Sequence, residues 1–329
     1  MSHCILRGED KKINKKRIHL LVVVLFMVFI AILPLVCDAP YLFHVIVIAN
    51  TLALLALSFD VIAGFVGQLN LGQSIFYGVG SYTVGFITMA YDIPGLLGLL
   101  FGGIGAAIFS LIVGIPCLRL KGPYYAIATL AFSQVLFTLA NAFPSITGSE
   151  EGITTIPSFI DGVVGNYYLS FALLALGVLS IRYMFRTEFG KKLISIREDE
   201  VLSDFAGVDT SRYKIIGSAI SAFMAGVAGS YSCYYLSIAS PDSLSIGLTF
   251  SVVAVVVFGG IGTIYGAVIG AFVLTFLTEY LYVIQEYRLV VYSGVIMLIV
   301  LYFPGGVMTL LKEKVFPNDV TSNKTTQEL

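Results

Sequence analysis

Residues 41–63 read YLFHVIVIANTLALLALSFDVIA, an apolar run with one acid, Asp60, and no Lys or Arg. A helix that crosses the roughly 30 Å hydrocarbon core of a bilayer needs about 20 apolar residues, so this run predicts a membrane-spanning helix. The whole 329-residue chain is similar, since 57% of its residues are hydrophobic and 12% are charged, against about 25% charged in soluble domains. This composition indicates a protein surrounded by membrane lipid. It excludes a soluble enzyme, a disordered chain and a nucleic-acid-binding protein.

We expect an all-α integral membrane protein of about ten transmembrane helices, because a helix pairs its backbone groups internally. Three glycines at 259, 260 and 262 separate two of the expected spans, where one broken or re-entrant helix is an equal alternative. Besides 41–63, the expected spans are 19–37, 73–91, 96–117, 123–143, 166–185, 214–236, 247–262, 264–284 and 289–310.

The positions of the Lys and Arg residues predict the orientation of the chain. Cations near span ends stay on the cytoplasmic side of a membrane. If ten helices alternate, 18 of the 19 Lys and Arg residues lie on one face, and only Arg288 lies on the other. The pattern predicts a basic cytoplasmic N-terminus at 1–18, a single transmembrane domain at 19–310 and a cytoplasmic tail at 311–329.

One polar segment is longer than a simple connection requires. Residues 187–213 read TEFGKKLISIREDEVLSDFAGVDTSRY and are expected on the cytoplasmic side. An apolar stripe among the charges predicts one or two short amphipathic helices, which Gly207 would end. The segment could lie on the lipid interface, pack under the bundle or dock a partner protein. Its apolar positions are Leu193, Ile196, Val201, Leu202, Phe205 and Val208.

The segment 144–165 is expected on the outer face. It contains TGSEEGITTIP, with two acids and few apolar residues. A solvated loop is the simpler interpretation, and contact with a delivery protein is the alternative.

The sequence contains no catalytic motif. HExxH, GxSxG and the GxxxxGK[ST] phosphate loop are all missing, so we expect neither an enzyme nor a cofactor or metal site in this chain. Acids within membrane spans are costly and are often functional. Asp60 and Glu279, which have no evident basic partner, therefore leave open an ion-coupled carrier.

Glycines punctuate two stretches, 64–85 and 259–270. Small residues allow close helix packing. They also permit an interrupted helix whose free backbone groups line a cavity. Polar side chains beside the first cluster suit an uncharged or zwitterionic solute, and we predict them as the substrate pathway. They are Gln68, Asn70, Gln73, Ser74, Tyr82 and Thr83.

Several motifs, in order along the chain, resemble those of branched-chain amino-acid ABC transporter permeases of the LivM type. GQLNLGQSIFYGVGSYT at 67–83 resembles G-Q-x-S-L-G-H-x-x-F-x-G-x-G-A-Y-T. LRLKGPYYAIATLAF at 118–132 is similar to LRLxGxYFAIxTLAF, and TGSEEGI at 147–153 to TGGxDGI. The IREDE stretch within 190–232, VVFGGIGTIYGAVIGA at 256–271 and FPGGVMTLL at 303–311 complete the pattern.

This resemblance implies a type II-like importer permease with broken or Gly-rich helices, in the inner membrane of a bacterium. Such a subunit pairs with a homologous LivH-type permease, two cytoplasmic ATPases that bind ATP and Mg, and an extracytoplasmic amino-acid-binding protein. The substrate would be a branched-chain amino acid, with urea or a short-chain amide as the alternative. The resemblance also makes 187–213 the ATPase coupling segment, with Arg197, Glu198, Asp199, Glu200 and Gly207 as its coupling residues.

Overall fold

The computed structural model describes residues 39–281, apart from 92–93, 118–119, 121, 155, 159 and 161, together with the isolated positions 294 and 297. Within these residues the chain is helical, which confirms the all-α fold class. The long helices are α2 (Pro40–Asp60), α3 (Gln73–Ala90), α4 (Gly95–Cys117), α5 (Pro123–Ala142), α7 (Val163–Met184), α10 (Thr210–Leu236), α11 (Ile246–Gly259) and α12 (Ile264–Tyr280). The shorter elements are η1 (Val61–Val66), α6 (Pro144–Thr147), η2 (Ser149–Glu151), α8 (Glu188–Glu198), α9 (Glu200–Phe205) and η3 (Pro241–Leu244).

Five helices of the described part are long and apolar enough to cross a membrane. They are Pro40–Val66, Gly95–Cys117, Pro123–Ala142, Val163–Met184 and Thr210–Leu236. Each lies on an expected span, so those five predictions are confirmed. The pair α11 and α12 is bent by 118° at its break and makes a sixth span if it is counted as one.

The expected number of ten spans is not reached among these residues. A helix fills 73–91 as predicted, but α3 is not among the helices apolar enough to span. The two spans expected at 247–262 and 264–284 form the bent pair instead. The spans 19–37 and 289–310, Arg288 and both chain ends lie outside the described residues.

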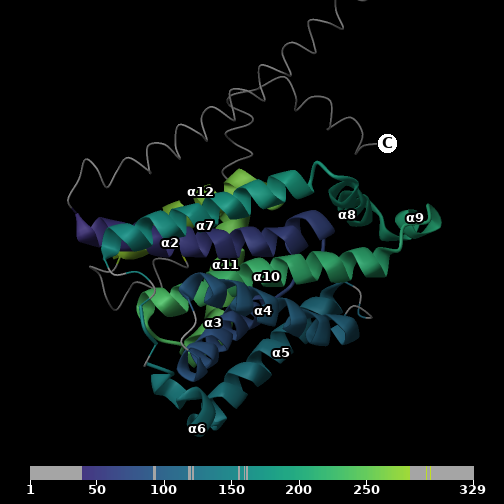
Figure 1. Cartoon of the computed structure of the whole chain (residues 1–329). Coiled ribbons are helices and arrows are strands. Elements are labelled where there is room, and N and C mark those ends of the chain that lie inside the picture. The colour runs from purple at the N-terminus through teal and green to yellow at the C-terminus, as the bar shows by residue number, and fades with distance from the viewer. Residues whose placement is uncertain are drawn as a thin grey trace, which may run out of the picture.

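The bundle is organised around α2 and α10 (Figure 1). The α10 helix packs against α4, α3 and α2, while α12 and α7 pack against α2. Most of α2 is buried, whereas only about a third or less of the spanning stretches of α5 and α7 is buried. The central position of α2 and α10 means that polar residues on these two helices face other helices.

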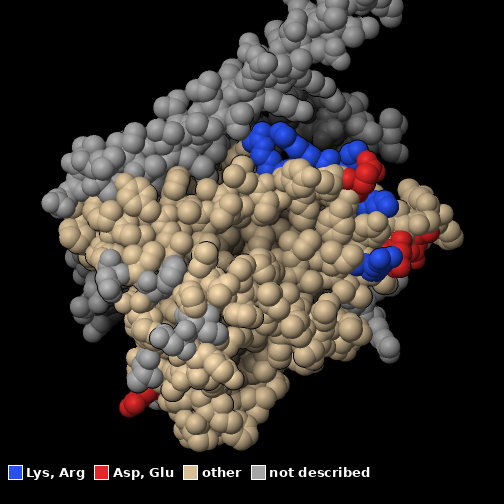
Figure 2. All heavy atoms as spheres, in the orientation of Figure 1, with Lys and Arg blue, Asp and Glu red and all other residues tan. Residues whose placement is uncertain are grey.

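The two ends of the bundle differ in charge. Every Lys and Arg that the structure describes falls between Arg182 and Lys214, close to α8 and α9. Figure 2 shows Lys and Arg, with several acids, gathered at one end of this face, while the other end shows an acid and no cation. We call this the charged end, and the end that carries α6 the opposite end.

At the opposite end the segment 144–165 is more ordered than predicted. Ile153 pairs with Ala239 in an antiparallel bridge. Ile153 and Ile156 are buried, 7% and 3% exposed, and both lie near Gly85 of α3. The interpretation of this segment as a solvated loop is therefore wrong at Ile153 and Ile156, because these two side chains pack into the bundle.

Glycines let α3, α4 and α10 approach closely. A methyl group on Gly80 of α3 would overlap the carbonyl oxygen of Gly226 in α10. A methyl group on Gly226 would lie 2.5 Å from the Ala106 methyl of α4. The two cysteines of these helices, Cys117 and Cys233, are free and buried, as expected for small apolar side chains.

This packing predicts different outcomes for two glycines of α4. In Gly102→Ala the new methyl group would overlap Ser230 Oγ and lie 2.9 Å from the Gly80 carbonyl oxygen. In Gly114→Ala it would lie 4.0 Å from Ser218 Oγ. We expect Gly102→Ala to lower the free energy of unfolding by about 1–3 kcal/mol and Gly114→Ala to change it by less than about 0.5 kcal/mol. Melting temperatures of the detergent-purified proteins test this, and equal values would contradict it.

Candidate functional site

The helix that begins at Pro40 is interrupted before α3 begins. Its last turn is the π-helix η1, and Gly67 follows with a φ of 79°. Residues 68–70 are not helical, and α3 starts at Gln73. Of the two roles left open for the first glycine cluster, the interrupted helix is observed here. A break of this kind leaves free backbone N–H and C=O groups that need partners.

The start of α3 lies in the interior of the bundle. Gln73 is fully buried, and its Nε2 donates to Ser58 Oγ of α2 at 2.8 Å and to Ser221 Oγ of α10 at 3.1 Å. Its Oε1 accepts from Asn70 Nδ2 at 3.2 Å. Because Ser221 is near the middle of α10, α3 begins about halfway through the bundle.

The free N–H groups at this start are bound by side chains. Gly72 N donates to Asn70 Oδ1 at 3.0 Å, and Leu71 N donates to Thr129 Oγ1 at 3.1 Å. Ser74 N donates to Thr249 Oγ1 of α11 at 3.1 Å. An amide and two hydroxyls therefore take the place of the helical carbonyl oxygens that the break removes.

The start of α11 meets the start of α3. Ser74 Oγ and Ser133 Oγ are 2.9 Å apart, and both bond the carbonyl oxygen of Leu244. The chain returns to this depth through η3 after leaving the opposite end at Ala239. We call the buried polar groups that meet here the central polar layer. Its members are Ser58, Asn70, Gln73, Ser74, Thr129, Ser133, Ser221, Thr249 and the carbonyl oxygen of Leu244.

An apolar pocket of about 230 Å³ adjoins the central polar layer. It lies one helical turn away, since Leu55, Tyr77 and Leu248 line it and neighbour members of the layer in sequence. Its walls come from α2, α3, α10 and α11, with a few hydroxyl groups among aliphatic side chains. The lining residues are Ile48, Thr51, Leu52, Leu55, Tyr77, Ser232, Tyr235, Leu236 and Leu248.

Three of the six predicted pathway residues come together, namely Asn70, Gln73 and Ser74. Gln68 follows the π-helical turn on the side of the charged end. Tyr82 and Thr83 lie further along α3, where Thr83 Oγ1 bonds the carbonyl oxygen of Val79 in its own helix. The pocket residues were not predicted, because apolar residues of a span carry no mark that separates a pocket from a packed interface.

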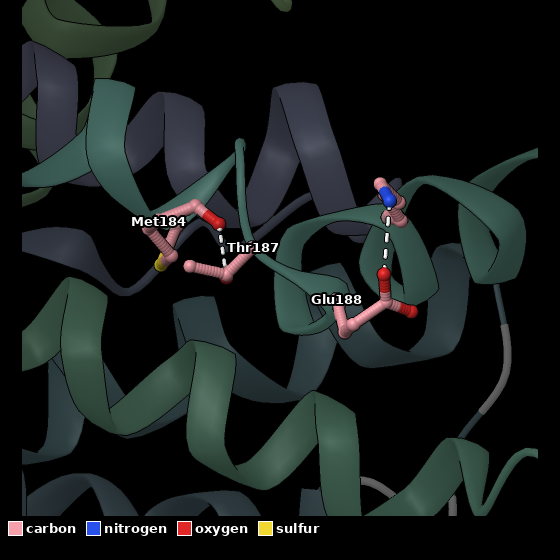
Figure 3. A network of polar contacts seen from close by, with 4 residues as sticks. Met184, Thr187 and Glu188 are labelled. Carbon is pink, nitrogen blue, oxygen red and sulfur yellow. Dashed lines mark hydrogen bonds and ion pairs between the residues drawn. The ribbon is translucent and has the colours of Figure 1, made fainter.

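The coupling segment predicted at 187–213 forms two short helices, as expected. Figure 3 shows the turn from α7 into α8, where Thr187 Oγ1 donates to the Met184 carbonyl oxygen at 2.6 Å. Glu188 pairs with Lys191 at 2.9 Å. That hydrogen bond lowers the pKa of the exposed Glu188 carboxyl.

The apolar stripe of this segment divides between the two helices. Leu193 and Ile196 of α8 are buried against the bundle. On α9, Leu202 and Phe205 are 66% and 86% exposed. The pattern of apolar residues in the sequence did not distinguish the buried set from the exposed set. Asp199, which caps α9 and separates it from α8, is the sequence feature that could have distinguished them.

An ion pair holds α9 in place. Lys214, 6% exposed, lies 2.6 Å from Glu200. Asp199 Oδ1 accepts from Leu202 N at 2.9 Å and caps the helix. Gly207 ends it with a φ of 84°. These contacts fix α9 at the charged end with its apolar side chains turned outward.

Asp60 and Arg197 both bond backbone groups at the helix breaks. Arg197 Nη1 of α8 donates to the carbonyl oxygen of Gly64 in η1. Asp60 Oδ1 accepts a 2.7 Å hydrogen bond from Gly262 N, between α11 and α12. A methyl group on Gly64 would lie 2.6 Å from that nitrogen, so the two breaks are in contact. We call Asp60, Gly64, Arg197 and Gly262 the break joint.

The two acids considered for ion coupling lie far apart. Glu279 accepts a hydrogen bond from Tyr41, in the first turn of α2, whereas Asp60 is the last residue of α2. At 1.5 Å per residue these positions are about 28 Å apart. Asp60 forms no ion pair with a described Lys or Arg, in line with the expectation, and Arg197 binds the nearby carbonyl oxygen of Gly64 instead.

Apolar helices of spanning length, a charge-segregated bundle and interrupted helices in its interior define a multi-pass membrane protein. The family described as "Branched-chain amino acid transport system / permease component" matches residues 41–302. The chain belongs to this family.

Named relatives include permease proteins of two kinds. The LivM permease protein of Escherichia coli (strain K12) is 28% identical over 79% of this chain and 68% of its own length. The LivH permease protein of Salmonella typhimurium is 28% identical over 81% of this chain and 94% of its own. A probable LivM permease protein of Methanocaldococcus jannaschii is 30% identical over 68% of this chain and 69% of its own length. No solved structure matches the chain.

The central polar layer predicts unequal roles for two predicted pathway residues. Gln73→Leu removes the bonds to Ser58 and Ser221 on two other helices. We expect it to lower the free energy of unfolding by about 1–2 kcal/mol. Thr83→Val removes a bond within one helix and should leave stability unchanged within about 0.5 kcal/mol. Thermal unfolding in detergent measures both, and a Thr83→Val variant as unstable as Gln73→Leu would contradict the assignment.

Proposed function

We propose that the chain is the transmembrane permease subunit of an ATP-driven importer of branched-chain amino acids. The observation that carries the proposal is the family match over 41–302, together with the printed names of the relatives. The proposed assembly contains a LivH-type permease, two ATPases that bind ATP and Mg, and an extracytoplasmic binding protein. The chain itself contributes no catalytic group or cofactor site.

In this proposal the charged end faces the cytoplasm of a bacterium and the chain lies in its inner membrane. The gathering of cations at one end supports this orientation through the positive-inside rule. Both termini are then cytoplasmic, at 1–18 and 311–329, around one permease domain at 19–310. The full fold would have about ten helices of the type II-like importer class.

The proposed substrate pathway joins the central polar layer to the apolar pocket. The pocket is lined mainly by aliphatic and aromatic side chains, which suit the side chain of leucine, isoleucine or valine. The buried amides of Asn70 and Gln73 and the hydroxyl of Ser74 suit the polar end of the same solute. A pathway in alternating access must not favour one state strongly, so the binding protein supplies most of the recognition.

The proposed energy input reaches the chain through α8 and α9. Exposed Leu202 and Phe205 offer an apolar contact for the ATPases, flanked by the acids Glu198, Asp199 and Glu200. Exposed aromatic side chains outside the membrane commonly mark protein interfaces. The α8 helix then carries the movement into the bundle, because its other face is buried there.

Reconstitution tests the transport function. The complete transporter in proteoliposomes, supplied with its binding protein, should accumulate labelled leucine only with ATP, and an uncoupler should not stop it. Excess valine or isoleucine should compete. Competition by urea or acetamide instead would favour the short-amide alternative. Uptake that an uncoupler abolishes, and that continues without the ATPases, would favour the ion-coupled carrier and overturn the proposal.

The docking role of α9 is tested by removing its exposed aromatic side chain. Phe205→Ser should reduce the amount of ATPase that co-purifies with the permease by about tenfold, as expected for a central aromatic contact. Tyr183→Ser is the control, since Tyr183 is 73% exposed near the same end but belongs to the spanning helix α7. Full ATPase recovery with Phe205→Ser would place the docking surface elsewhere.

A further inference from the structure

The break joint connects three segments that are far apart in the sequence: the end of α2 with η1, the helix α8, and the break between α11 and α12. Asp60 ends α2, Gly64 lies in η1, and Gly262 lies between α11 and α12. Arg197 comes from α8, outside the membrane-spanning helices. A methyl group on Gly262 would lie 2.9 Å from Arg197 Nη1 and 3.2 Å from the Gly64 carbonyl oxygen. The guanidinium group therefore sits directly against both breaks.

The surroundings of this guanidinium group are electronegative. The C-terminal end of η1 directs the Gly64 carbonyl oxygen at the guanidinium group, and the C-terminal end of α11 is followed by Gly262 beside it. A helix C-terminus carries roughly half a negative charge. Asp60 adds a carboxyl group that is 1% exposed. Its Oδ1 is bonded to Gly262 N, while its buried Oδ2 has no hydrogen-bond partner among the described residues. Two helix ends and a buried acid form a site for a cation, which the chain fills with Arg197.

We infer that Arg197 is a positioning residue that couples α8 to both helix breaks by acting as their internal cation. This inference rests on the proposed function and deepens it: Arg197 transmits movement inside the chain, while α9 contacts the ATPases. When α8 is displaced, the cation withdraws from Gly64 and Gly262. The breaks at η1 and between α11 and α12 then lose the charge that holds them together.

The two breaks are also the places where the pathway helices begin or end. The η1 break leads into α3 through Asn70 and Gln73 of the central polar layer. The α11 helix runs from Thr249 in that layer to its end at Gly259. A shift at the joint therefore reaches the central polar layer through the loop that precedes α3 and through α11. This gives α8 a direct mechanical route to the proposed pathway.

A charge cycle tests the inference in the complete transporter. Arg197→Gln leaves Asp60 and the helix ends uncompensated, and breaking such a site costs more than removing both charges. We expect Arg197→Gln to lower the leucine taken up per ATP hydrolysed by about fivefold or more, with the ATPases still bound. Asp60→Asn combined with Arg197→Gln should recover at least about half of that loss. Arg186→Gln, an exposed arginine beside α8, is the matched control and should match wild type.

Each outcome decides the matter. Wild-type stoichiometry in Arg197→Gln, loss of the ATPases from it, or a double variant as poor as the product of the singles would overturn the inference. If the Arg197→Gln chain does not fold, Arg197→Lys replaces it, and a loss above about fivefold there would overturn the role of the charge. The same variants can be compared by the melting temperatures of the purified chains, a measurement that does not depend on transport. We expect the double variant to melt at a higher temperature than Arg197→Gln. Leucine uptake by wild type without ATP would overturn the proposed function alone.

Discussion

The structure depends on one constraint, the need of every backbone group at a helix break inside a membrane bundle to find a partner. Water cannot supply these partners in the hydrocarbon region. At the start of α3 the free N–H groups are bound by Asn70, Thr129 and Thr249. At the end of η1 the free carbonyl oxygen of Gly64 is bound by Arg197. The buried polar side chains of this chain are therefore first of all the complement of its interrupted helices.

The same requirement bears on the proposed substrate pathway. Hydroxyl and amide groups that satisfy the breaks gather between four long helices and α11, beside the apolar pocket. A movement that separates the helix ends must release some of these groups, and a zwitterionic solute offers them alternative partners. Fold and pathway thus use the same side chains, so most substitutions in the central polar layer will change stability and transport together.

Long-range pairing sets the limit of what the sequence could predict. The spans at 96–117 and 123–143 follow from continuous apolar runs, and the helices match them closely. Residues 73–91 fit a helix but not an apolar span, because glycine and polar residues interrupt the run. That Gln73 bonds Ser58 and Ser221 depends on the packing of α3 between α2 and α10, which no local pattern encodes. The outward side chain of Phe205 likewise follows from the turn at Asp199.

The acid within the first described span shows why position alone does not decide a role. Asp60 in an apolar run suggests ion coupling, because a charge there is costly. In the folded chain its carboxyl group bonds the backbone at Gly262, and Arg197 of α8, from outside the spans, bonds the Gly64 carbonyl oxygen at the same joint. In the inference drawn above, the guanidinium group offsets part of the cost of the buried acid while α8 stays docked. In that inference, an acid that suggests a transport site instead explains why α8 and the membrane breaks would move as one unit.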